Sequence, residues 1–207
     1  MLKLDPNQKK IAIAILAAGK GSRFNGDCPK PLALFQGRSL LCHALTAAIN
    51  SKLGPILLVV GYQHQQVATA AANVLIVHNP DWQRGIASSL QTAIQVIEPD
   101  FTIGALCVGL ADQPLIGAEA YRRLACAYHQ GVSFAVATYK GARRNPVLLG
   151  RGMWPEVMHL TGDEGARALM KSYPVMEVAC DRTGNPLDID TTADLQVLET
   201  NILSYSS

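Results

Sequence analysis

A glycine-rich segment directly after the first apolar run carries the clearest chemical signal in the sequence. It reads Leu16-Ala17-Ala18-Gly19-Lys20-Gly21-Ser22-Arg23, and Lys30 follows it between two prolines. Small residues let the backbone approach a ligand, and successive N–H groups in such a turn form an anion-binding nest. Arg23 and Lys30 add two positive charges, and arginine binds phosphate oxygens in a bidentate manner. The segment predicts a loop that cradles a polyphosphate, with a purely structural turn as the alternative.

The spacing of this loop differs from two common nucleotide-binding motifs. It lacks the Gly-Lys-Ser/Thr triplet of the P-loop, and Phe24 stands where G-x-G-x-x-G needs its third glycine. A dinucleotide-dependent oxidoreductase is therefore a poor fit to this sequence.

Three aspartates stand at or beyond the ends of apolar segments. Asp112 follows the run Ile103–Gly109, and ligands of open α/β sheets bind beyond the carboxyl ends of the strands. Asp188 and Asp190 lie two apart in Pro186–Asp190, which we predict to be the last strand, so both side chains face one way. Like charges on one face are costly unless a cation or solvent compensates them. If that face points to Asp112, a Mg²⁺ site follows, because Mg²⁺ prefers a few carboxylates plus phosphates and water. The alternative makes Asp112 a turn residue and Asp190 a helix cap.

Polar residues elsewhere are weaker candidates. Ser88 and Ser89 lie at the start of a predicted helix, where they can bind base, ribose or phosphate, or simply cap the helix. Arg143 and Arg144 precede a predicted strand, and Asn145 begins it. They can receive an anionic group, although a pair of arginines there is more often a solvated turn.

Alternating strand and helix patterns predict the elements that position these residues. The expected strands are Ile11–Leu16, Ile56–Val60, Val74–Val77, Ile103–Gly109, Ser133–Thr138, Asn145–Leu149, Val175–Ala179 and Pro186–Asp190. The expected helices are Ser39–Ser51, Gln63–Ala72, Ile86–Ile97, Gly117–Gln130, Glu156–Leu160, Asp163–Tyr173 and Thr191–Asn201. Capping boxes, Thr161 with Glu164 and Thr191 with Asp194, predict how the last two helices begin. The pattern predicts one three-layer α/β/α domain with a mostly parallel sheet.

Composition excludes several classes of protein. The chain has 207 residues, of which 49% are hydrophobic and 16% charged, so it is not a disordered protein. A net charge of +2 gives no electrostatic footprint for nucleic acid or a membrane surface. The longest apolar run, Ile11–Ala18, is too short to span a bilayer. Five cysteines without a C-x-x-C pair indicate reduced thiols, and we expect a cytoplasmic protein.

The loop L-A-A-G-x-G-x-R, with its following Pro-Lys, resembles the nucleotidyltransferases of the GT-A-like α/β class. Within that class the chain is most similar to the molybdenum cofactor cytidylyltransferases, a MobA-like NTP transferase family. The ordered motifs that carry this resemblance are the loop, Asn79–Leu90, Ala111–Pro114, Arg144–Val147, Thr161–Arg167 and Leu187–Thr191. The resemblance implies a nucleotide-diphospho-sugar transferase-like fold, with a Rossmann-like nucleotide-binding half at about residues 10–115 and an acceptor-binding half at about 116–200.

The resemblance also implies an activity and a role for each candidate. The expected reaction transfers CMP from CTP to the phosphate of a molybdopterin-type acceptor and releases pyrophosphate, with Mg²⁺, or alternatively Mn²⁺, as the ion. The implied catalytic residues are Arg23, Lys30 and Asp112. The implied nucleotide-binding residues are Leu16, Ala17, Ala18, Gly19, Gly21, Ser22, Arg23, Lys30, Ser88, Ser89 and Asp112. The implied acceptor-binding residues are Arg143, Arg144, Asn145, Gly162 and Asp163. The implied metal ligands are Asp112, Asp190 and Asp188.

Two features of the resemblance bear on the substrates. Alanine at the position of Ala18 is associated with cytidylyl transfer and glycine with guanylyl transfer, so CTP is expected. The family commonly has glycine where this chain has Arg144, which leaves the acceptor open. A guanylyl transferase, a sugar- or alcohol-phosphate nucleotidyltransferase and a non-catalytic nucleotide-binding cofactor chaperone remain alternatives. The implied partners are the NTP, a phosphorylated pterin and a molybdoenzyme that receives the product.

Overall fold

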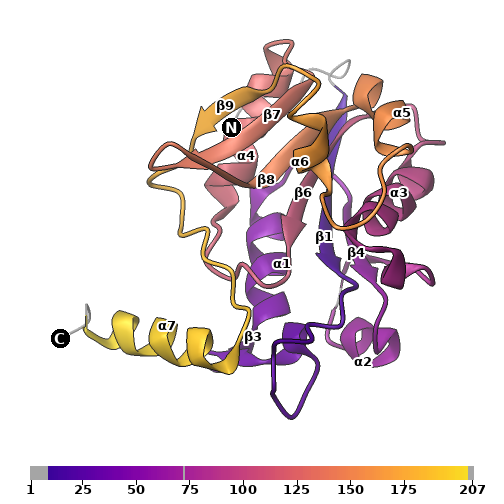
Figure 1. Cartoon of the computed structure of the whole chain (residues 1–207). Helices are drawn as coiled ribbons and strands as arrows, with labels where there is room; N and C mark the ends of the chain where they lie inside the picture. Colours follow the sequence, from indigo (N-terminus) through magenta and orange to yellow (C-terminus); the bar gives the residue numbers. More distant parts are fainter. Residues whose placement is uncertain (1–8, 72, 205–207) are drawn as a thin grey trace.

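A seven-stranded sheet runs through the computed structural model, which describes residues 9–71 and 73–204 (Figure 1). The strand order is β5-β4-β1-β6-β8-β7-β9. The bounds are β1 (Lys10–Ala17), β4 (Ile56–Val60), β5 (Leu75–His78), β6 (Ile103–Leu110), β7 (Phe134–Tyr139), β8 (Ala142–Gly150) and β9 (Met176–Ala179). Strand β8 is antiparallel to β6 and β7, and the other neighbouring pairs of this described sheet are parallel. The predicted α/β fold with a mostly parallel sheet is confirmed.

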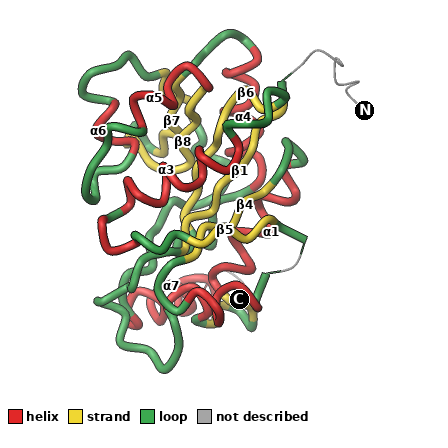
Figure 2. The backbone as a smooth tube through the Cα atoms, turned by 90° about the vertical axis from the view of Figure 1, so that its right-hand side faces the viewer, coloured by secondary structure: helices red, strands yellow, loops and turns green. Residues whose placement is uncertain are grey.

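Helices cover both faces of the sheet. The bounds are α1 (Leu40–Ser51), α2 (His64–Thr69), α3 (Ile86–Ile97), α4 (Ala118–His129), α5 (Trp154–Val157), α6 (Ala166–Leu169) and α7 (Thr192–Ser204), with short 3₁₀ turns η1 (Lys30–Leu32), η2 (Trp82–Arg84) and η3 (Arg151–Met153). Alternate residues of a strand face opposite sides. Ile11, Ile13 and Ile15 of β1 pack in the cluster that contains side chains of α1 and α4. Ala12, Ala14 and Leu16 pack in the cluster that contains α3, α5 and α6 side chains, on the face seen in Figure 2.

Chain order explains why the glycine-rich segment meets Asp112. From β1 the chain builds β4 and β5 on one side and then returns to place β6 on the other side of β1. The carboxyl ends of β1 and β6 therefore lie side by side, with Leu16 paired to Leu110 and the Ala111 amide donating to the Leu16 carbonyl at 3.1 Å. Such a point of reversed strand order is where open α/β sheets bind ligands.

The C-terminal helix α7 packs away from the main sheet. Leu198 of α7 and Ile189 join Phe35 of the two-stranded ribbon β2 (Leu34–Phe35) and β3 (Arg38–Ser39), with Leu40, in a small separate core (Figure 1). The capping box predicted at its start is confirmed, because the Asp194 amide donates to Thr191 Oγ1 at 3.1 Å and the Thr191 amide donates to Asp194 Oδ2 at 2.8 Å.

Two predictions about the last quarter of the chain are wrong. The segment Pro186–Asp190 is not a strand in the structure, because it joins neither sheet. The helix predicted over Asp163–Tyr173 is only α6, and the capping box of Thr161 with Glu164 is not formed. Gly165, which precedes α6, has φ of +55° and caps it without a side-chain hydrogen bond. Among the described residues, none of the helices has the length and apolar character needed to cross a membrane.

Candidate active site

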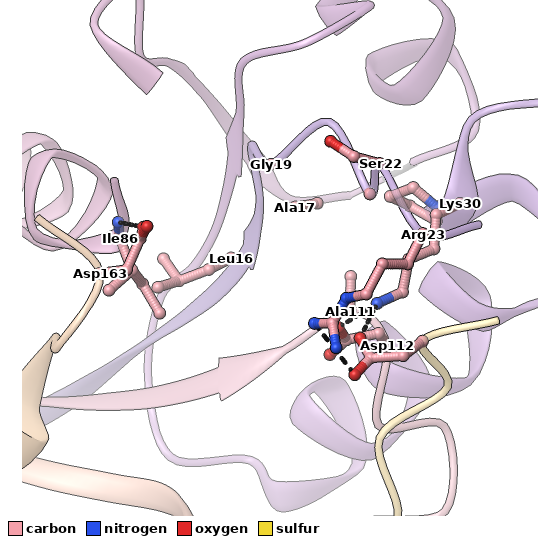
Figure 3. A pocket seen from close by; sticks show the side chains of 13 residues that line it. Leu16, Ala17, Gly19, Ser22, Arg23, Lys30, Ile86, Ala111, Asp112 and Asp163 are labelled. Carbon is pink, nitrogen blue, oxygen red and sulfur yellow. Dashed lines mark hydrogen bonds and ion pairs between the residues drawn. The ribbon is translucent and has the colours of Figure 1, made fainter. Parts of the chain in front are cut away.

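The glycine-rich segment forms one wall of a cleft of about 480 Å³ at the carboxyl end of the sheet (Figure 3). We call it the loop cleft. It is lined by Leu16, Ala17, Gly19, Gly21, Ser22, Arg23, Lys30, Pro31, Ile86, Ala111, Asp112, Asp163 and Asp190. Gly21 has φ of +63°, and a Cβ there would lie 2.9 Å from Lys30 Cβ, so this turn requires glycine. A Cβ on Gly19 would have no heavy atom within 4 Å, which leaves its backbone open to a ligand.

The ammonium group of Lys30 holds two carboxylates together in this cleft. Lys30 Nζ donates to Asp112 Oδ2 at 2.7 Å and to Asp190 Oδ1 at 3.0 Å. The Lys30 side chain is only 10% exposed, whereas that of Arg23, which pairs with Asp190 Oδ2 at 3.1 Å, is 76% exposed. Three segments that are distant in sequence thus meet around Lys30, while Arg23 keeps the freedom to reach a ligand.

The surroundings of Asp112 leave polar groups without a partner. Asp112 Oδ1 and Gln113 Oε1 are buried and accept no hydrogen bond from the described residues. The Gln113 amide nitrogen donates to Asp188 Oδ1 at 2.8 Å. Burial raises the pKa of Asp188, and the charge of Asp112 raises it further, while the hydrogen bond from Gln113 lowers it. A nearby positive charge stabilises the charged form of such crowded, partly desolvated carboxylates.

These carboxylates fit a divalent cation only in part. Within the described part of the chain, no three acidic, histidine or cysteine side chains converge on one point as a complete metal cage. Asp112 and Asp190 converge instead on Lys30. The free oxygen Asp112 Oδ1 is nevertheless a suitable ligand for Mg²⁺, because this ion needs one or two carboxylates and takes its other ligands from substrate phosphates and water.

The amino terminus of α3 is capped from a distant part of the chain. The Ile86 amide donates to Asp163 Oδ1 at 3.2 Å, and the Ala87 amide donates to the Gly162 carbonyl at 3.1 Å. Gly85 permits this approach, because a Cβ there would lie 2.5 Å from the Gly162 carbonyl carbon. Figure 3 shows the Asp163–Ile86 contact at the opposite side of the view from Lys30 and Asp112. Gly162 and Asp163, which the resemblance assigns to acceptor binding, fasten the second half of the chain to α3 in the structure.

Ser88 and Ser89 are buried on α3 and are bonded to protein groups. Asn79 Nδ2 donates to Ser88 Oγ at 2.9 Å and to Ser89 Oγ at 3.0 Å, and Ser88 Oγ donates to the Gly85 carbonyl at 2.8 Å. Ser89 lines a pocket of about 220 Å³ beside the loop cleft, together with Ala18, Gly19 and Trp82. Ser88 lines none of the described clefts discussed here, so its hydroxyl supports the start of α3 from within.

A second cleft of about 370 Å³ adjoins the loop cleft, and we call it the arginine cleft. Arg143, Arg144 and Asn145 of β8 and Arg167 of α6 contribute to its wall. Four residues line both clefts and form their common border, namely Arg23, Ile86, Asp163 and Asp190. Asp188 lines only the arginine cleft of these two.

Three residues at the site were missed by our sequence analysis. Gln113 is 2% exposed and fixes Asp188, Asp194 fixes the backbone at Asp190 with a bond of 3.1 Å, and Arg167 faces the arginine cleft. Gln113 directly follows Asp112, which was an available signal. The sequence predicts Asp194 only as part of a capping box. It places Arg167 at the end of the motif Thr161–Arg167, without a role of its own.

Comparison with known proteins agrees with this geometry. The profile described as "MobA-like NTP transferase domain" matches residues 13–178. The chain belongs to this family. Two curated relatives are the Bifunctional protein GlmU of Rhodopseudomonas palustris (strain ATCC BAA-98 / CGA009), 34% identical over 66% of this chain, and that of Mycolicibacterium vanbaalenii, 32% identical over 69%. The chain spans about 30% of the length of each.

Solved structures give a longer match. The crystal structure of Rv0371c from Mycobacterium tuberculosis H37Rv has a TM-score of 0.81 and 26% identity, and the match covers 93% of this chain and 99% of that one. A structure of Rv0371c in complex with manganese matches with a TM-score of 0.75. Molybdopterin-guanine dinucleotide biosynthesis protein A from Archaeoglobus fulgidus, at 13% identity, covers 93% of this chain and 99% of its own with a TM-score of 0.71, which shows the shared fold.

Proposed function

We propose that the chain transfers CMP from CTP to the phosphate of a molybdopterin-type acceptor and releases pyrophosphate. The observation that carries the proposal is the cluster of Lys30, Asp112 and Asp190 in the loop cleft, because Asp190 also lines the adjoining arginine cleft. One cleft is walled by a glycine-rich loop that suits a triphosphate, and the other is walled by arginines that suit an anionic acceptor.

The residues of the loop cleft divide the work of the transfer. Backbone N–H groups from Gly19 to Ser22 bind the phosphates of the nucleotide. Lys30, held in place by burial, and Arg23, which is free to turn, neutralise the charge that develops on the pyrophosphate as it leaves. An oxygen of the acceptor phosphate forms a bond to the α-phosphorus, and the bond from that phosphorus to the bridging oxygen breaks, so pyrophosphate departs with the electron pair.

Asp112, Asp190 and Asp188 are the residues that would hold a divalent cation. Such an ion, when bound, screens the charge of the phosphates and stabilises the transition state. The buried free oxygen of Asp112 and the raised pKa of Asp188 support a cation at this place. The manganese complex of Rv0371c supports a divalent ion, and we propose Mg²⁺ as the ion used, with Mn²⁺ as its substitute.

The small pocket beside the loop supports CTP as the nucleotide. Its volume of about 220 Å³ is lined by Leu16, Ala18, Gly19, Trp82 and Ser89, among others. The methyl group of Ala18 narrows this pocket relative to glycine, and a pyrimidine is one ring smaller than a purine. Residues of about 10–115 would then bind the nucleotide and residues of about 116–200 the acceptor. The five free cysteines support a reducing compartment, the cytoplasm. The product would pass to a molybdoenzyme.

Pyrophosphate release across a nucleotide and acceptor panel tests the proposal. The purified protein is given CTP, GTP, ATP or UTP with molybdopterin, a sugar 1-phosphate or an alcohol phosphate. We expect turnover with CTP and molybdopterin. Asp112→Asn should lower this turnover by about 10²–10³-fold, whereas Asp100→Asn is the control, since Asp100 lines none of these clefts.

Other outcomes of this panel select among the alternatives. A clear preference for GTP, or for a sugar or alcohol phosphate, would replace the proposed substrates and keep the reaction type. Tight binding of CTP with no turnover on any acceptor would favour a nucleotide-binding cofactor chaperone.

A further inference from the structure

Four arginines and four acidic residues line the arginine cleft, and two of these arginines have no carboxylate partner among the described residues. Each of its four acidic residues already has a partner: Asp163 accepts from the Ile86 amide, Glu164 from Lys171, Asp188 from Gln113, and Asp190 from Lys30 and Arg23. Arg143 is paired with Glu177 at 2.8 Å. The positive charges of Arg144 and Arg167 have no carboxylate partner within residues 9–71 and 73–204.

These two arginines face the arginine cleft and not the loop cleft. Arg144 Nη1 donates only to the neighbouring Arg143 carbonyl, at 3.1 Å. The Arg167 side chain forms no hydrogen bond with the described residues. Arg23 and Asp190, by contrast, line both clefts. An anion held by Arg144 and Arg167 is therefore separate from the phosphate that must react beside Lys30 and Asp112.

Apolar side chains also line the arginine cleft. They are those of Leu110, Val136, Val147, Ala166 and Met170. A wall of aliphatic side chains and a methionine suits the face of a flat ring better than it suits a sugar covered with hydroxyl groups. The cleft volume of about 370 Å³ lies within the range of small-molecule sites.

We propose that Arg144 and Arg167 form a second anion-binding subsite for an acceptor with two anionic groups and a ring between them. One anion, a phosphate, lies beside Lys30 and Asp112. The other, a carboxylate, phosphate or oxyanion, is bound by the two guanidinium groups. This subsite rests on the proposed function and names a substrate class for it: acceptors with a single phosphate and a neutral far end are poor substrates.

Binding of two matched fluorescent pterins tests this subsite without turnover. Pterin-6-carboxylate carries a ring and an anion, and 6-hydroxymethylpterin has the same ring without the charge. The titrations are run with and without CTP, because CTP occupies the cations of the loop cleft. We expect the wild-type protein to bind the carboxylate at least about tenfold more tightly, as a charge-assisted hydrogen bond implies.

Arginine variants then locate the anion. Arg144→Gln and Arg167→Gln should each weaken binding of pterin-6-carboxylate by about tenfold and leave binding of the neutral 6-hydroxymethylpterin unchanged. Arg182→Gln is the matched control, because Arg182 is also exposed, has no ion pair among the described residues and lines neither cleft. Failure of the wild-type protein to prefer the carboxylate, or equal losses in the control, would overturn the subsite.

The two proposals fail in distinguishable ways. If the protein prefers the carboxylate through these arginines but releases no pyrophosphate, the subsite is supported and the proposed reaction is wrong. If the protein turns over CTP, and Arg144→Gln and Arg167→Gln leave the KM of the acceptor unchanged, the reaction is supported and the subsite is wrong.

Discussion

The loop cleft and the arginine cleft share a border but differ in how their charges are satisfied. In the loop cleft the buried Lys30 is already bonded to Asp112 and Asp190, so the site is assembled before any substrate binds. In the arginine cleft Arg144 and Arg167 have no carboxylate partner among the described residues. A preassembled cluster holds reacting groups in place, while unmatched charges at a rim select what enters.

Asp112→Asn is the strongest test of the preassembled cluster. Asparagine keeps the size of the side chain and a bond to Lys30, but it removes the charge beside the nucleotide. We expect turnover to fall by about 10²–10³-fold, as for the loss of one electrostatic group at a reacting centre. Pyrophosphate release measures this loss, and circular dichroism checks that the fold is kept. Near-normal turnover with Mg²⁺ would contradict the assignment of Asp112.

Gly21→Ala and Gly19→Ala form a pair that tests the loop itself. Alanine in place of Gly21 would have to adopt a positive φ, and its Cβ would lie 2.9 Å from Lys30 Cβ. We expect the free energy of unfolding to fall by about 1–2 kcal/mol, from the left-handed backbone alone, and the KM for the nucleotide to rise. Alanine at Gly19 has free space and should leave stability nearly unchanged. Denaturant unfolding of both variants compares them, and equal stability losses would refute the requirement for glycine at position 21.

Asp163→Ala tests the border between the two clefts. It removes the carboxylate that caps the Ile86 amide, and the loss of such a cap costs about 1 kcal/mol of folding free energy. The same change loosens the wall that both clefts share, so we also expect the KM of the acceptor to rise. Asp163→Asn retains an oxygen acceptor and should recover most of the stability. Thermal unfolding and acceptor KM are measured together; a stability loss without any change in KM would leave Asp163 as a cap alone.

The pattern of the sequence was sufficient for the elements that pack on both sides. The buried strand Ile56–Val60 and the helix Ile86–Ile97 have their predicted bounds, because a continuous apolar run and a helical stripe each follow from burial. The loop residues and Asp112 were placed at one edge because parallel strands end there together. The chemical type of a residue and the local pattern of buried positions can both be read from a few neighbouring residues of the sequence.

Interactions between distant segments were beyond that pattern. Pro186–Asp190 joins neither sheet, and an apolar alternation does not reveal whether a neighbouring strand has a free edge. The cap of α3 by Asp163 joins residues that are 77 positions apart. For the same reason the bond from Lys30 to Asp190, across 160 positions, was inferred only as a shared site and not as an ion pair.

Asp100 sharpens the comparison from outside both clefts, because its effect should be on stability and not on turnover. The Thr102 hydroxyl and the Thr102 amide, the latter at 2.8 Å, lower the pKa of Asp100 from its usual 3.8. A lowered pKa in the folded state means that the charged form stabilises the fold. This contribution is complete above about pH 4 and is lost as the pH falls through the folded-state pKa. Asp100→Asn should therefore lower Tm on the order of 1 °C at pH 7, and the difference from wild type should shrink as the pH falls below about 4. Thermal scans between pH 3 and 7 measure this difference in Tm.

A difference in Tm that stayed constant with pH would show that the charge of Asp100 does not contribute to stability. Any loss of turnover at pH 7 would extend the active region beyond the two clefts.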